Sequence, residues 1–71
     1  MMKSEIKSVI GKNIRKIRIR KGISQDHLSK LADLSLNSIV KIEAGKNTNP
    51  TIITLSKIAK SFNVKIDDLI R

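Results

Sequence analysis

The side chains best suited to recognition chemistry lie close together, at residues 36–41. The amide of Asn37 can bond to both groove-facing groups of an adenine, and Lys41, four residues later, can reach guanine acceptors or a phosphate. Leu36 and Val40 can rest against the methyl group of a thymine. In a helix these four residues share one face. Apolar side chains exposed to water on that face would not stabilise the protein, so their presence favours contact with another molecule. The pattern therefore predicts a surface that contacts base edges in DNA.

Catalytic chemistry is poorly represented in the sequence. The chain has no Cys and one His, His27, and it lacks a carboxylate pair at functional spacing and a glycine-rich phosphate loop. A lone His cannot form a zinc site, and we expect His27 to face solvent. These observations predict a protein that is not an enzyme and has no cofactor, metal or small-molecule ligand.

The charge of the chain points to a polyanionic partner. Its 15 Lys and Arg residues outnumber 6 Asp and Glu residues, which gives a formal charge of +9. Eight of the basic residues lie within residues 1–22. Phe62 is the only aromatic residue, so stacking on unpaired bases is excluded and double-stranded DNA is favoured. A basic helix lying on a membrane is a weaker alternative, because it lacks aromatic anchors.

No apolar stretch approaches the roughly 18 residues of a membrane span, and the first residues do not resemble a secretion signal. We therefore expect a cytoplasmic protein without a membrane partner.

Short helices must position these residues. Isoleucines at positions 6, 10, 14 and 17 predict a first helix that ends near Gly22. Ser24 can cap a second helix, whose inward residues we expect to be Leu28, Leu31 and Ala32. The two helices account for residues up to about 32.

The third helix should carry the recognition residues. Asp33 can adopt a left-handed turn and Ser35 can cap the helix, while Ile39 and Ile42 face inward. Gly45 should end it.

Two further helices follow a polar loop. Thr51 can cap a fourth helix, which places Phe62 at the centre of the core. A last short helix from about Ile66 should be anchored by Leu69 and Ile70, and the only weak strand signal is at residues 63–65. We predict an all-α fold, a compact bundle of five short helices in one domain over residues 1–71.

Residues 24–45, two short helices joined by a three-residue break, match a helix-turn-helix. The pattern within this motif is carried by Gln25, Leu28, Leu34, Ser35, Ile39, Glu43 and Gly45, and outside it by Arg18, Gly22, Pro50, Leu55, Ile58, Ala59 and Val64. Together these residues resemble the phage repressor and Cro family, also called the XRE family. Ser29 and Asp33 depart from the pattern, since the family usually has Ala and Gly at these positions.

The resemblance implies a lambda-repressor-like DNA-binding domain. It also implies a structural ion pair between Arg18 and Glu43, which bridges the first helix and the end of the third. Lys46 and Asn47, in the loop that follows, would hold the DNA backbone.

The beginnings of the second and third helices offer further backbone contacts. Free N–H groups and the helix dipole favour a phosphate there. Gln25, Ser35 and Ser38 are therefore candidates for positioning the protein on DNA without reading its sequence.

A second surface is predicted near the C-terminal end. Ile53, Ile66 and Ile70 are not needed inside the bundle, so they either form peripheral core or a patch for a two-fold dimer. A dimer would place two recognition helices about 34 Å apart on an inverted-repeat operator.

These features predict a sequence-specific transcriptional regulator that binds double-stranded DNA, of the repressor or restriction-modification controller type. The alternative is the antitoxin of a toxin-antitoxin pair, which would bind a partner protein as well as DNA. Such proteins usually carry a toxin-binding segment, and we expect none here.

Overall fold

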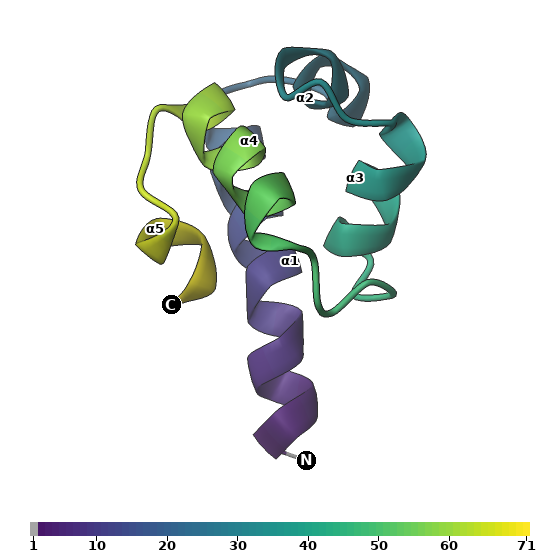
Figure 1. The fold of residues 1–71 in the computed structure, drawn as a ribbon, viewed down its shortest axis with the longest axis vertical. Coiled ribbons are helices and arrows are strands. Elements are labelled where there is room, and N and C mark those ends of the chain that lie inside the picture. The colour runs from purple at the N-terminus through teal and green to yellow at the C-terminus, as the bar shows by residue number, and fades with distance from the viewer. Residues whose placement is uncertain (1) are drawn as a thin grey trace.

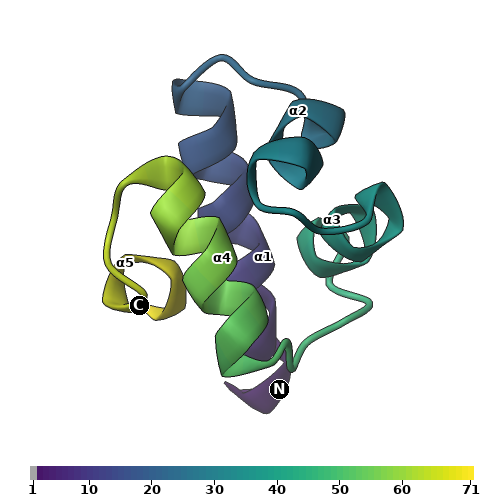
Figure 2. The same ribbon diagram turned by 45° about the horizontal axis from the view of Figure 1, so that its top comes forward.

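The protein is described by a computed structural model that covers residues 2–71, with side chains described from Val9 onward. Five α-helices and no strand occur in this range, which confirms the all-α prediction (Figure 1). Helix α1 forms the axis of the molecule, and α3 and α5 lie on opposite sides of it (Figure 2). The helices are α1 (Met2–Arg20), α2 (Gln25–Leu31), α3 (Leu36–Glu43), α4 (Ile52–Phe62) and α5 (Asp67–Ile70).

Three helices begin at the caps predicted from the sequence. The side-chain oxygens of Ser24, Ser35 and Thr51 each accept a hydrogen bond from the backbone N–H three residues later, at 3.0 to 3.1 Å. Each cap satisfies an N–H group that has no partner inside its helix. Local side-chain chemistry therefore fixes where α2, α3 and α4 start.

Left-handed residues end the helices and make the turns. Gly22 and Gly45 have φ values of 70° and 76°, and Asp33 takes φ 55° in the turn between α2 and α3, as predicted. Asn63 ends α4 at φ 58°. Residues 63–65, which carry a weak strand signal, therefore form a turn into α5.

The core is made by the inward faces of all five helices. Phe62 is 1% exposed and lies within this cluster, as expected. Ile6, which we expected on the inward face of α1, lies outside the residues whose side chains are described. The buried apolar residues are Ile14, Leu28, Ala32, Ile39, Ile42, Leu55, Ile58, Ala59, Phe62 and Leu69.

The prediction that Leu31 faces inward was wrong, because its side chain is 53% exposed. The buried arc of α2 is formed by Leu28, Ser29 and Ala32. Leu31 lies roughly 110° from the centre of that arc at 100° per residue. Ser29 is buried instead, and its hydroxyl donates to the carbonyl of Asp26 at 2.7 Å.

Helix α5 buries one of the two apolar side chains that were predicted to hold it against the bundle. Leu69 is fully buried, whereas Ile70, expected as a second anchor, is 46% exposed. The amide of Asn13 also donates to the carbonyls of Leu69 and Arg71, at 2.9 and 2.8 Å. These contacts fasten α5 against α1.

Within the described residues, no helix is both long enough and apolar enough to cross a membrane.

Candidate nucleic-acid interface

Helix α3 presents two different faces. Ile39 and Ile42 are almost completely buried. Leu36 and Val40 are 44% and 39% exposed, and Asn37 and Lys41 are also exposed. All four predicted base-reading side chains therefore lie on the solvent side of α3, which forms an outer edge of the molecule (Figure 2).

The end of α3 is fixed by an ion pair with α1. Arg18 Nε donates to Glu43 Oε2 at 2.7 Å and Arg18 Nη2 donates to Oε1 at 3.0 Å, which makes the contact bidentate. The two side chains are 12% and 4% exposed. The hydrogen bonds to Glu43 and its negative charge raise the pKa of Arg18, although burial opposes them. The expected partners are thus in direct contact.

The same carboxylate also binds α2. Gln25 Nε2 donates to Glu43 Oε1 at 3.1 Å, and Arg18 Nη1 donates to the carbonyl of Ile23 at 2.8 Å. The sequence predicted only a phosphate contact for Gln25. Its amide nitrogen has a second hydrogen, so the bond to Glu43 leaves one donor for another partner. One acidic residue therefore connects α1, α2 and α3.

Gly11 determines how closely α1 approaches α3, and sequence reasoning missed it. A Cβ atom at Gly11 would collide with the carbonyl oxygen of Ile42 and lie 3.3 Å from the Cα of Glu43. Only a residue without a side chain lets the two backbones meet in this way. An isolated glycine within a helical pattern was the available signal.

The predicted phosphate contacts already take part in local hydrogen bonds. The hydroxyls of Ser35 and Ser38 lie 2.8 Å apart, so one of them donates to the other. Asn47 Oδ1 accepts from the N–H of Asn49 at 3.1 Å, which leaves its amide nitrogen available. Lys46 is exposed in the same loop. The bonds within the protein orient these side chains without using all their donors.

A hollow of about 360 Å³ lies beside α3, and one of its lining residues was not among the contacts predicted from the sequence. Arg15 from α1 lines it together with Gln25 and Val40. A guanidinium and an amide at the edge of α3 suit a phosphate. Arg15 therefore joins the candidate contacts.

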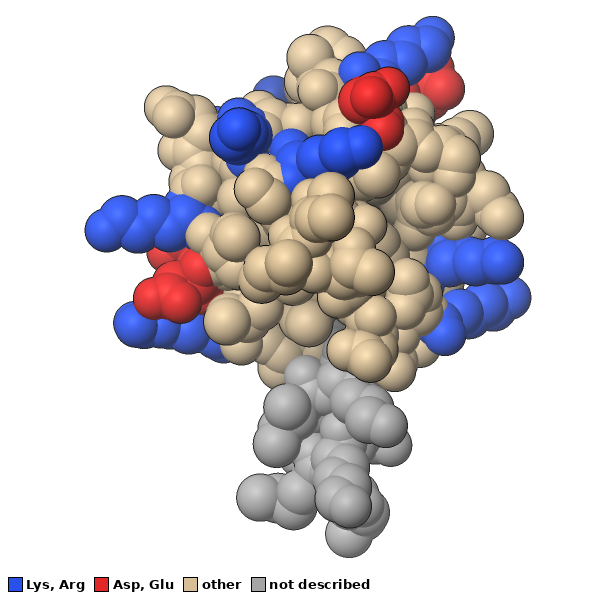
Figure 3. Space-filling view, viewed as in Figure 1, with Lys and Arg blue, Asp and Glu red and all other residues tan. Residues whose placement is uncertain are grey.

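Charge alone does not single out this surface. On the face that α4 crosses, basic side chains lie at both sides and across the upper part, and the middle is uncharged (Figure 3). The exposure and composition of α3 therefore distinguish the candidate interface from the rest of the surface.

His27 is exposed, and no group of metal-ligating side chains occurs in the described part of the chain.

Comparison with known proteins places the chain in a family. The helix-turn-helix family model HTH_3 matches residues 14–69. The HTH-type transcriptional regulator SlrR of Bacillus subtilis is 36% identical over 61 residues, which are 86% of this chain and 40% of SlrR. An HTH-type transcriptional regulator of Archaeoglobus fulgidus is 39% identical over 56 residues, 79% of each chain. The chain thus spans less than half of SlrR but most of the archaeal protein.

A solved structure agrees with these relatives. The restriction-modification controller protein C.AhdI of Aeromonas hydrophila superposes with a TM-score of 0.84 at 25% identity, over 89% of this chain and 94% of that one. The sequence match, the five-helix fold and the exposed face of α3 agree with one another. The chain belongs to the HTH_3, or XRE, helix-turn-helix family.

Proposed function

We propose that the chain regulates transcription by placing α3 in the major groove of a specific double-stranded DNA site. The supporting observation is the outer face of α3, where Leu36, Asn37, Val40 and Lys41 are exposed while the opposite face is held in the core. The amide and ammonium groups would bond to base edges, and the apolar pair would contact thymine methyl groups.

Residues around α3 would hold the DNA backbone. Each of them retains a side-chain donor or a full charge, except that only one of the hydroxyls of Ser35 and Ser38 is free to donate. Two of them, Arg15 and Lys46, are charged, and with two phosphates neutralised the affinity would fall about tenfold between 50 and 200 mM salt. The residues are Arg15, Gln25, Ser35, Ser38, Lys46 and Asn47.

A homodimer on an inverted repeat is the arrangement that we propose on DNA. Ile52 and Ile53 on α4 are each 66% exposed and Ile70 is 46% exposed, so these side chains are available to a second copy. Ile66 is half-buried and packs against the core, which favours the peripheral-core alternative for this residue. Two copies of α3 would lie about 34 Å apart.

Within the family, the likeness to a restriction-modification controller supports a small controller or repressor that acts in the cytoplasm, where its DNA target lies. The relatives are named as transcriptional regulators, so the antitoxin alternative is not favoured.

Selection of preferred sites from random duplex DNA tests the proposal. We expect one enriched sequence, and we expect Asn37→Ala and Lys41→Ala to lose preference at individual base pairs, with about 1–3 kcal/mol of discrimination lost at each. Lys60→Ala, which removes an exposed charge from α4, is the control and should keep the preference. Absence of enrichment over bulk DNA, with both α3 variants binding like the parent, would refute sequence-specific regulation.

Sedimentation of the protein on operator DNA tests the dimer. We expect two copies per inverted repeat and one copy when Ile53→Ser and Ile70→Ser are combined. Full occupancy of both half-sites by this double variant, at the parent's affinity, would rule out the proposed surface.

A further inference from the structure

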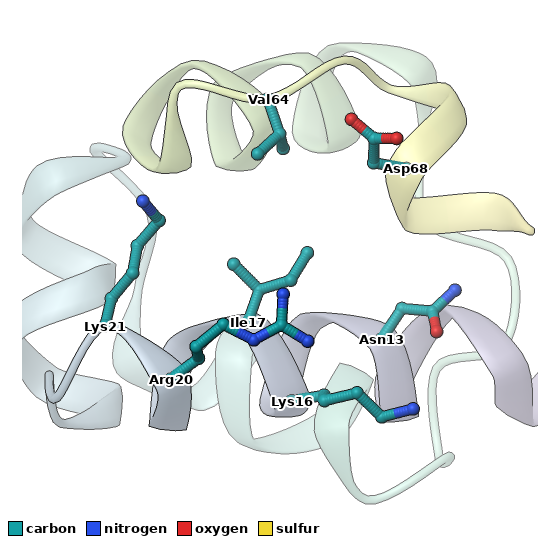
Figure 4. A pocket seen from close by; sticks show the side chains of 7 residues that line it. All are labelled: Asn13, Lys16, Ile17, Arg20, Lys21, Val64 and Asp68. Atoms are coloured by element: carbon teal, nitrogen blue, oxygen red, sulfur yellow. The ribbon is translucent and has the colours of Figure 1, made fainter.

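A groove of about 410 Å³ lies between α1 and the segment that joins α4 to α5. Lys16, Ile17 and Arg20 of α1 line one wall, and Lys21 follows them at the end of the helix. Val64 lines the opposite wall (Figure 4). None of these residues belongs to the proposed DNA interface.

The groove and the contact with α3 use opposite sides of α1. Asn13, Lys16, Ile17 and Arg20 follow the spacing of a single helix face. Arg18, which bonds to the end of α3, lies roughly half a turn away around the same helix. A molecule in the groove would therefore leave the outer face of α3 free.

The groove carries an excess of positive charge. Lys16, Arg20 and Lys21 contribute three cations and Asp68 one carboxylate, which leaves a net charge of +2. In the described part of the chain the ion pairs of the basic residues are Arg18–Glu43, Lys30–Asp26 and Arg71–Asp67, so they include none of these three cations. Asp68 accepts a hydrogen bond from the N–H of Lys65 at 3.1 Å.

Apolar side chains occupy the middle of the groove. Ile17 and Val64 are half-buried and point toward each other from its two walls, while Lys21 and Asp68 lie at opposite ends (Figure 4). The walls are held in place because Asn13 donates to two carbonyls at the end of α5. A volume of a few hundred Å³ is typical of small-molecule sites. Five of the seven lining residues are polar or charged and two are apolar, so the groove favours a ligand that has a charged part and a small apolar part.

We propose that this groove binds a small phosphate monoester that carries a compact apolar group. A phosphate monoester has a charge between −1.5 and −2 at pH 7, which matches the net +2 of the lining. Its oxygens would accept charge-assisted hydrogen bonds from the lysines and Arg20, and its apolar part would lie between Ile17 and Val64. No small-molecule ligand was predicted from the sequence. The groove could not be foreseen, because residues 13–21 and 64–68 become neighbours only in the folded chain.

Phenyl phosphate is a suitable probe. Inorganic phosphate, which has the charge but no apolar group, is the comparison. We would titrate each into the isotope-labelled protein and follow the backbone resonances of residues 13–21 and 64–68 by NMR. We expect phenyl phosphate to bind about tenfold more tightly than inorganic phosphate, because its ring buries apolar surface.

Matched variants locate the binding. Arg20→Gln should weaken phenyl phosphate about tenfold, as expected for loss of a charge-assisted hydrogen bond. Val64→Ser should weaken phenyl phosphate and leave inorganic phosphate unchanged. Lys60→Gln, an equal loss of charge on α4 outside the groove, should change neither. Thermal melting of each variant establishes that it is folded at the titration temperature.

Three results would overturn the proposal. Equal affinity for the two phosphates, or equal weakening by Lys60→Gln and Arg20→Gln, would show only general attraction of anions. Tighter binding of a short phosphotyrosine peptide than of phenyl phosphate would identify a phosphorylated protein as the source of the group. Displacement of phenyl phosphate by duplex DNA would assign the groove to the DNA backbone.

Discussion

The inner face of α3 is buried in the core of the protein, whereas its outer face is exposed to solvent. On the inner face, Ile39 and Ile42 are almost fully buried, and Glu43 accepts three side-chain hydrogen bonds from α1 and α2. On the outer face, in the described part of the chain, Asn37 and Lys41 make no side-chain hydrogen bond within the protein. The inner residues are therefore restricted by the fold, whereas the outer residues are free to be selected for a partner. Substitutions on the two faces should change different measured quantities.

The largest effect is expected for Glu43→Ala. This change leaves Arg18 mostly buried without its partner, and breaking a buried pair costs about 3–5 kcal/mol. Urea unfolding should show a loss of that size in the free energy of unfolding. Asp67→Ala, which removes an exposed pair with Arg71, is the control and should change it by less than about 0.5 kcal/mol. If Glu43→Ala unfolds like the parent and loses only DNA binding, the ion pair between Arg18 and Glu43 is not structural.

Gly11→Ala tests the contact between the backbones of α1 and α3. Helix propensity alone would favour alanine by about 1 kcal/mol. The added methyl group, however, collides with the carbonyl of Ile42, and overpacking costs about 1–3 kcal/mol together with backbone shifts. We expect net destabilisation in urea and displaced resonances in α3. Stabilisation, as expected at an exposed position of α1, would show that the two helices can separate freely.

Leu36→Ser examines the outer face. We expect DNA affinity to fall by about 1 kcal/mol through lost apolar contact, while the free energy of unfolding changes by less than about 0.5 kcal/mol. Leu31→Ser is a matched control, because Leu31 is a similarly exposed leucine on α2, 53% against 44% for Leu36. Equal losses of affinity in the two variants would show that Leu36 has no special role in binding.

The smallest effect is expected in the turn that joins α2 to α3. Asp33 has φ 55°, a region that costs most residues roughly 1–2 kcal/mol and costs glycine almost nothing. Asp33→Gly should therefore stabilise the domain by less than about 1 kcal/mol, and Asp33→Ala should destabilise it by a similar amount. Thermal unfolding measures both, and equal midpoints would mean that the turn relaxes to another conformation.

Local features of the fold could be predicted from the sequence, whereas contacts between helices could not. The caps at Ser24, Ser35 and Thr51 and the exposed stripe on α3 depend on residues a few positions apart. The burial of Ser29 in place of Leu31 depends on how α2 is rotated against its neighbours. The role of Gly11 and the bond from Gln25 to Glu43 depend on how closely separate helices approach.

The bonds from Asn13 to the end of α5 also bear on the order of folding. They join residues 56 and 58 positions apart, whereas α2 contacts α3 directly after a short turn. Closing a long loop is entropically costlier and slower than closing a short one. We therefore expect the helix-turn-helix to become structured early and α5 to dock last, so that the proposed DNA-binding helix α3 is formed before α5 packs against α1.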